Sequence, residues 1–110
     1  MKEVMRDLIS PTGVLGCFVI DKEGEIVDYL CKKSINETLV SALIAEVTNE
    51  IANQMQIPAE FSIFSMAENG NIFMIAREEF ILTVITAPGV DTGKARLKLR
   101  RGARLIAELL

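Results

Sequence analysis

The chain has 110 residues, of which half are apolar and a quarter are charged, with a formal net charge of -3. This length and composition predict one globular domain and exclude a disordered or fibrous chain. No apolar run approaches the roughly 20 residues that cross a bilayer, the first residues do not resemble a signal peptide, and we expect a cytoplasmic protein.

The basic residues are concentrated at one end of the chain. Residues 1–93 hold 14 acids and 6 bases, whereas residues 94–110 hold 6 bases and 1 acid. A basic surface is therefore expected from the last segment alone. That segment has no aromatic residue on which a base could stack, so we expect no nucleic-acid partner.

Turn-forming residues divide the chain into segments, and these segments predict the elements in chain order. A short amphipathic helix spans residues 2–9, and strands follow at 14–20 and 25–31 around the turn DKEG. A capping box of Ser34 and Glu37 introduces a helix over 36–56 that ends before Pro58. Strands at 61–67, 72–77 and 80–86 and a helix over 94–110 complete the chain, with Asp91 or Thr92 as its N-cap.

This order predicts an α+β fold, α-β-β-α-β-β-β-α, in which helices cover both faces of one antiparallel sheet of five strands. Strands 14–20 and 80–86 are almost uniformly apolar and are expected at the centre of the sheet. Strand 61–67 alternates serine with larger residues and is expected at an edge, where an unpaired strand invites a partner.

The two cysteines are expected to be free. If Asp21 pairs with Gly24 in the hairpin, Cys17 lies opposite Asp28 and the thiols are about three rungs apart, too far for a disulfide. The sequence contains no histidine, which removes the commonest general base and metal ligand. With no nucleophile, base and orienting group together, we expect no enzyme activity, no metal and no cofactor.

The loop 87–93 resembles a phosphate-binding loop but departs from the pattern. Gly89 and Gly93 enclose three residues where the pattern has four, and Ala95 stands where a magnesium-binding hydroxyl would follow Lys94. A nucleotide site is not expected here.

The long helix shows two stripes. A helical wheel groups its large apolar residues as the expected sheet-facing core, and beside them runs a stripe of small residues. We interpret the small stripe as a homodimer seam beside strand 61–67, and the alternative is an ordinary exposed surface without a partner. The large residues are Leu39, Val40, Leu43, Ile44, Val47, Ile51 and Met55. The small stripe consists of Ser41, Ala45, Thr48 and Ala52.

The last helix is expected to place Ala95, Leu99, Ala103, Ile106 and Leu110 against the core. Its basic stripe has three open interpretations: a solvated face, a balance for the acidic remainder, or a docking surface for an anionic partner such as an acidic protein or lipid headgroups. The basic residues considered for docking are Lys94, Arg96, Arg100 and Arg104, flanked by Lys98 and Arg101.

The ordered set of segments resembles the Roadblock, or dynein light chain, family. The resemblance rests on GVLGCFVIDKEGEIV, the long helix, FILTVIT and PGVDTGKARLKLRRGARLIAEL, and covers about residues 4–110. It implies a five-stranded antiparallel sheet with the long helix on one face and the terminal helices on the other. It also implies dimers that join their third strands into one ten-stranded sheet with the long helices side by side, and the helix part of that interface maps onto the small stripe. The strand part of that interface maps onto residues 60–67, namely Phe61, Ser62, Ile63, Phe64 and Ser65.

The resemblance also implies a function. Members of the family serve as non-catalytic platforms for small Ras-like GTPases, with the long helices of the dimer facing the GTPase. Two alternatives are a structural adaptor subunit, which pairs with itself or a Roadblock paralogue without affecting hydrolysis, and a ligand-sensing domain. The exposed positions that would contact a GTPase are Thr38, Ala42, Glu46, Asn49 and Asn53.

Overall fold

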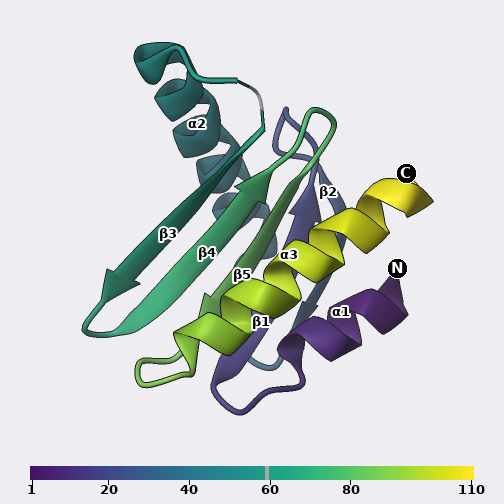
Figure 1. The fold of residues 1–110 in the computed structure, drawn as a ribbon, viewed down its shortest axis with the longest axis vertical. Helices are drawn as coiled ribbons and strands as arrows, with labels where there is room; N and C mark the ends of the chain where they lie inside the picture. Colours follow the sequence, from purple (N-terminus) through teal and green to yellow (C-terminus); the bar gives the residue numbers. More distant parts are fainter. Residues whose placement is uncertain (59) are drawn as a thin grey trace.

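The computed structural model describes residues 1–58 and 60–110. Within that part of the chain, three helices surround one antiparallel sheet of five strands in the order β2-β1-β5-β4-β3 (Figure 1). The helices are α1 (Lys2–Ile9), α2 (Glu37–Met55) and α3 (Thr92–Leu109). The strands are β1 (Val14–Ile20), β2 (Ile26–Cys31), β3 (Phe61–Ala67), β4 (Gly70–Ala76) and β5 (Ile81–Thr86).

The predicted fold class and element order are confirmed. The apolar strands β1 and β5 are neighbours inside the sheet, and β3 lies at an edge as its serines predicted. Helix α2 covers one face of the sheet, and α1 and α3 lie side by side on the other (Figure 1). We call these the α2 face and the α1/α3 face.

Each face has its own apolar cluster because side chains alternate along a strand. On the α1/α3 face, Leu8 and Leu99 pack with Cys17, Phe73 and Leu82. On the α2 face, Ile44 and Ala45 pack with Phe18, Met74 and Ile81. The sheet is therefore the shared wall of two separate cores.

The β1–β2 hairpin differs in register from the prediction. Cys17 pairs with Leu30 and Gly16 with Cys31, because the turn is longer than two residues and a bulge follows Val19. Asp21 stabilises this turn by accepting hydrogen bonds at Oδ1 from the backbone of Glu23 and Glu25. Cys17 and Cys31 thus belong to neighbouring residue pairs of β1 and β2, but their side chains lie on opposite faces of the sheet, and both thiols are free.

The turn between β3 and β4 requires a glycine. Gly70 has φ of +150°, and a Cβ on it would lie 2.6 Å from the carbonyl oxygen of Thr86 on the neighbouring strand. A side chain there would collide with backbone rather than with a movable group. The hairpin closes with Ala67 paired to Gly70.

The helix ends show which polar side chains act as caps. Asn36, rather than the expected Ser34, caps α2, because its Oδ1 accepts a hydrogen bond of 3.2 Å from the Leu39 N–H. Gln56 ends α2 in the left-handed conformation, two residues before Pro58. Of the two predicted N-caps of α3, Asp91 is the one that caps it, accepting a hydrogen bond of 3.0 Å from the Lys94 N–H.

Candidate functional site

Helix α2 rests on the sheet through its small residues, which corrects the sequence prediction. Ser41, Ala45 and Thr48 are all buried against the chain's own sheet, and Ala52 is partly buried. The Thr48 hydroxyl donates to the Ile44 carbonyl oxygen at 2.6 Å, which satisfies it within the helix. The prediction that these side chains form an exposed dimer seam is wrong for the three buried ones, because they occupy the helix-to-sheet contact themselves.

The large apolar residues of α2 are displaced to the flank of the helix. Leu39, Leu43 and Val47 are 55%, 49% and 46% exposed, and Met55 at the end of the helix is 65% exposed. Their expected position under the helix is therefore wrong, although Ile44 is buried as predicted. Small residues let α2 approach the sheet closely, so the bulkier side chains beside them remain at the surface.

These flanking residues open onto an apolar groove between α2 and the sheet. The groove has a volume of about 490 Å³, and its wall on α2 includes Val40, Leu43 and Val47. Its floor is the α2 face of the outer strands, including Ile63 of β3 and Ile72 of β4. Exposed large apolar residues that gather in one place mark an interaction site.

The groove adjoins the unpaired edge of β3. Among the described residues, β3 pairs with β4 on one side, and no strand lies on its other side. Its side chains alternate, with Ile63 in the α2-face cluster and Phe64 packed against the α1/α3-face cluster. An apolar groove and a free strand edge therefore meet along the same border of the molecule. The predicted strand residues at this border are Phe61, Ser62, Ile63, Phe64 and Ser65.

The five positions expected to contact a GTPase are exposed and belong to α2. They are Thr38, Ala42, Glu46, Asn49 and Asn53. One of them also holds the fold, because the Asn49 Nδ2 donates to the Lys22 carbonyl oxygen at 2.9 Å and so ties α2 to the β1–β2 turn. The helix carries three acids and no base, so its exposed surface is acidic.

The basic residues of α3 differ in how they are used. The Arg96 guanidinium lies 4.8 Å from the centre of the Phe64 ring, and the Lys98 Nζ forms an ion pair of 3.0 Å with Asp7 of α1. Lys94, Arg100 and Arg104 are exposed, and none of the ion pairs between described residues includes them. Two of the six bases therefore help to hold the fold, and the others are available to a partner.

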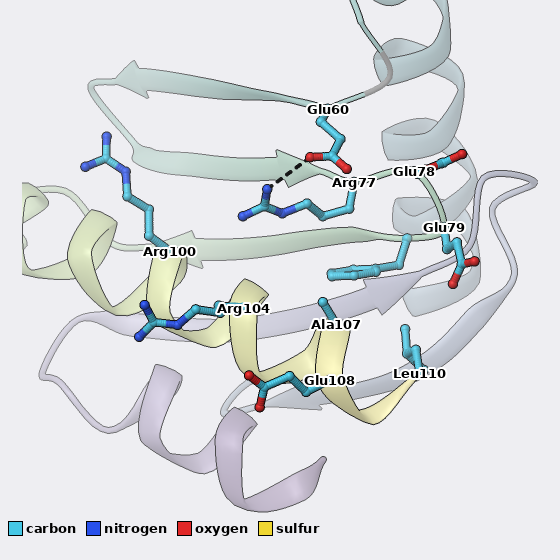
Figure 2. Close-up of a pocket in the computed structure, with 10 residues that line it drawn as sticks. Glu60, Arg77, Glu78, Glu79, Arg100, Arg104, Ala107, Glu108 and Leu110 are labelled. Atoms are coloured by element: carbon cyan, nitrogen blue, oxygen red, sulfur yellow. Dashed lines mark hydrogen bonds and ion pairs between the residues drawn. The ribbon is translucent and has the colours of Figure 1, made fainter.

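Arg100 and Arg104 border an open groove of about 650 Å³ between α3 and the β4–β5 turn (Figure 2). Arg77 pairs with Glu60 at 3.3 Å on the strand side, and Glu78 and Glu79 follow at the turn. Figure 2 shows Arg100 and Arg104 extending from α3 with no ion pair to the carboxylates drawn. The groove is lined by both acidic and basic side chains, and these side chains do not converge on one point where they could bind a ligand together.

The start of α3 is occupied by the protein's own carboxylate. Asp91 accepts a hydrogen bond from the Lys94 N–H at the position where a bound phosphate would accept one. This geometry agrees with the sequence prediction of an N-cap at the start of this helix. Within residues 1–58 and 60–110, no group of three His, Cys, Asp or Glu side chains could hold a metal ion.

The thiols lie in environments that keep them protonated. Burial raises the pKa of Cys17 to about 12, and the neighbouring Cys31 acts in the same direction. Burial and the Glu37 carboxylate raise the pKa of Cys31. Nucleophilic chemistry needs a thiolate, and neither site promotes one.

The architecture is that of known proteins, although the sequence alone matches no protein-family model and no curated protein. An MglB solved in a tetrameric arrangement superimposes with a TM-score of 0.87 at 18% identity, covering 97% of this chain and 85% of that chain. The gliding protein MglB of Thermus thermophilus gives 0.86 at 18% identity, with the same coverage. A Roadblock/LC7 domain from Streptomyces avermitilis gives 0.83 at 8% identity, covering 99% of this chain and 96% of that domain.

The chain has the Roadblock/LC7 fold. At these identities the likeness concerns the fold, and it confirms the one that the sequence resemblance implied. Within this Roadblock fold, the long helix α2 borders the exposed apolar groove on one side, and residues of β3, β4 and β5 form its floor.

Sequence reasoning misses the apolar flank of α2 as a surface. It places Leu43 and Val47 in the core because the apolar periodicity of a helix indicates which positions are hydrophobic but not how deeply each side chain is buried. The available signal is the small-residue stripe beside them, since a helix with two adjoining apolar stripes has more apolar surface than one contact can bury. Ile72 of β4, which is 40% exposed, carries no sequence signal that separates it from a core residue.

Among the residues that the structure describes, no helix is apolar over a length that would span a membrane.

Proposed function

We propose that this protein is a cytoplasmic, non-catalytic homodimeric platform that binds and regulates a small Ras-like GTPase. The observation that carries the dimer is the apolar groove of Val40, Leu43, Val47, Ile63 and Ile72 beside the unpaired edge of β3. Exposed apolar surface and a free strand edge are both liabilities in an isolated chain, and one partner would cover both.

The geometry of strand pairing favours a second copy as that partner. Two β3 strands that pair antiparallel are related by a two-fold axis perpendicular to the sheet, which leaves both α2 helices on the same face. Each helix then brings Leu43 and Val47 toward the outer strands of the other copy. The interface that we propose keeps the β3 residues of the sequence prediction and replaces the small stripe with the large apolar flank of α2.

The fold supports the GTPase as partner through the family resemblance. Roadblock proteins of this type present the paired long helices to a GTPase, and in the proposed dimer these helices share one face. The exposed positions there are Thr38, Ala42, Glu46 and Asn53, with Asn49 contributing mainly to the fold. The acidic surface of α2 suits a partner with a neutral or basic contact surface.

A charge reversal on α2 tests this proposal. Purified Ras-like GTPases of the source organism, loaded with GDP or with a non-hydrolysable GTP analogue, are titrated against the protein by calorimetry. We expect Glu46→Arg to weaken binding at least about tenfold, because an extended basic side chain would enter the contact. Glu108→Arg is the matched control, since Glu108 is exposed on α3 across the sheet and the charge change is the same.

The same titration separates the two functional alternatives. Faster GTP hydrolysis with wild type and a smaller effect with Glu46→Arg would identify a regulator. Binding without any change in hydrolysis, or preferential pairing with a Roadblock paralogue, would identify a structural adaptor. Equal affinities for Glu46→Arg and Glu108→Arg would contradict the assignment of α2 as the contact surface.

A further inference from the structure

Charge is distributed unequally between the two sides of the sheet. Helices α1 and α3 together contain eight bases and three acids, a net charge of +5, whereas the whole chain has -3. The remainder of the chain therefore carries -8, including three acids and no base in α2. Since α2 lies on the opposite face from α1 and α3, the molecule has an electric dipole directed across the sheet (Figure 1).

Exposed leucines accompany the bases on the outer side of α3. Lys94, Leu97, Arg101 and Leu105 recur at spacings of three and four residues, so they lie along one line of the helix. All four are exposed, and Leu97 is 57% exposed. The inner side of α3 is closed instead by Ala95, Leu99, Ala103 and Ile106, which belong to the core.

The available cations and the exposed leucines thus share a surface. Arg96 and Lys98 are engaged with Phe64 and Asp7, which leaves four exposed bases on α3. Clusters of this size on an amphipathic helix attract anionic lipid headgroups, and leucines between them can enter the headgroup boundary. The four bases are Lys94, Arg100, Arg101 and Arg104.

We propose that the α1/α3 face docks on an anionic lipid bilayer, with α3 lying in the headgroup plane. Charge complementarity identifies the occupant, because α3 has a net charge of +5, from six bases and one acid, whereas α2 on the opposite face has three acids and no base. An acidic peptide is less suited, since the groove of about 280 Å³ beside Leu105 is also lined by the carboxylates of Glu3 and Asp7. The four bases and Leu97 and Leu105 form the docking surface.

This inference rests on the proposed function in one respect, the number of helices that touch the membrane. In a dimer with both α2 helices on one face, both α3 helices lie on the other face and bind together. The platform would then hold its GTPase on the side that points away from the bilayer. A single chain would still bind through one α3, but more weakly.

Vesicle flotation tests the proposal with the protein alone. Vesicles of phosphatidylcholine with about 30 mole per cent phosphatidylglycerol are expected to carry the protein to the top of the gradient, and pure phosphatidylcholine vesicles are not. Raising the salt concentration should weaken binding, because exposed charges are screened. Failure of the wild-type protein to float with the anionic vesicles would overturn the proposal.

Paired charge reversals locate the surface. We expect Arg101→Glu with Arg104→Glu to lower the vesicle partition coefficient roughly a hundredfold. Lys32→Glu with Lys33→Glu changes the net charge by the same amount at exposed positions between β2 and α2, and should retain most of the binding. An equal loss in both double variants would show a response to total charge and would overturn the assignment to α3.

Further measurements distinguish membrane binding from binding to other polyanions, and they test membrane binding independently of the proposed function. Leu97→Ser with Leu105→Ser should lower vesicle binding about tenfold and leave the salt dependence in place. Equal binding to polyglutamate or to duplex DNA as to the anionic vesicles would reveal a general polyanion surface and would overturn the proposal. Light scattering of the same samples reports the dimer, and the Glu46→Arg titration reports the GTPase contact, so each can fail independently of the vesicle result.

Discussion

Both faces of the sheet carry apolar side chains, but helices cover the two faces to different extents. On the α1/α3 face, two helices lie side by side and bury Leu8, Leu99 and Ile106 almost completely. On the α2 face, a single helix lies mainly over β1 and β2, and the outer strands remain open beside it. One helix is too narrow to cover a sheet of this width, so the uncovered part becomes the candidate site.

The two helices that pack on these faces also use their residues differently. Helix α3 places leucine and isoleucine inward, and the exposed apolar side chains on its outer line are separated by bases. Helix α2 places serine, alanine and threonine inward and exposes leucine and valine. Large exposed apolar residues on α2 are consistent with a contact that the isolated chain does not complete.

The largest expected effect comes from placing a charge in the open part of the α2 face. Val47→Asp should abolish the proposed dimer at micromolar concentration, because the carboxylate would be buried against apolar side chains without a partner. Light scattering would show the chain mass of 12.1 kDa for the variant and twice that mass for the wild type. Leu97→Asp, a similar change on α3, should leave the dimer intact. A monomeric wild-type protein would contradict the dimer proposal.

A second effect compares leucines on the two faces in a monomeric background. Leu99→Ala should lower the free energy of unfolding by about 3 kcal/mol, because Leu99 is fully buried and its removal leaves a cavity. Leu43→Ala should lower it by less than about 1 kcal/mol, since half of that side chain is already exposed. Urea unfolding of chains that also carry Val47→Asp measures both. Similar losses would show that α2 packs more tightly than described.

A third effect is the pH dependence of stability that the buried Cys17 thiol in the α1/α3 core imposes. The Cys17 pKa is raised from 9.0 to about 12 in the folded chain, so the unfolded chain releases the thiol proton first. The stability that this thiol contributes is complete below pH 9 and is lost progressively as the pH rises toward 12. Urea unfolding across this range should show a shallower decline for Cys17→Ala. Parallel declines would indicate that solvent reaches the thiol.

The sequence was sufficient for the order and approximate bounds of the elements because these depend on local features. Pro58 and the turn residues separate the segments, Asp91 caps α3, and uniformly apolar β1 and β5 belong inside a sheet. The prediction was wrong for the strand register, which changes when a turn is longer by a single residue. The β1–β2 turn is longer than expected, and this shifts Cys17 from Asp28 to Leu30.

Only the tertiary structure decided which side of α2 meets the sheet. A helical wheel shows that Leu43 and Ala45 lie on neighbouring stripes, but both stripes are compatible with burial. The choice depends on how closely the helix approaches the strands and on how much of the sheet it covers, and both are properties of the packed layers. The sequence by itself determined a three-layer Roadblock architecture and a basic last helix. The assembled layers determined that the small stripe is core, that the apolar flank is surface, and that the bases face away from the acidic helix.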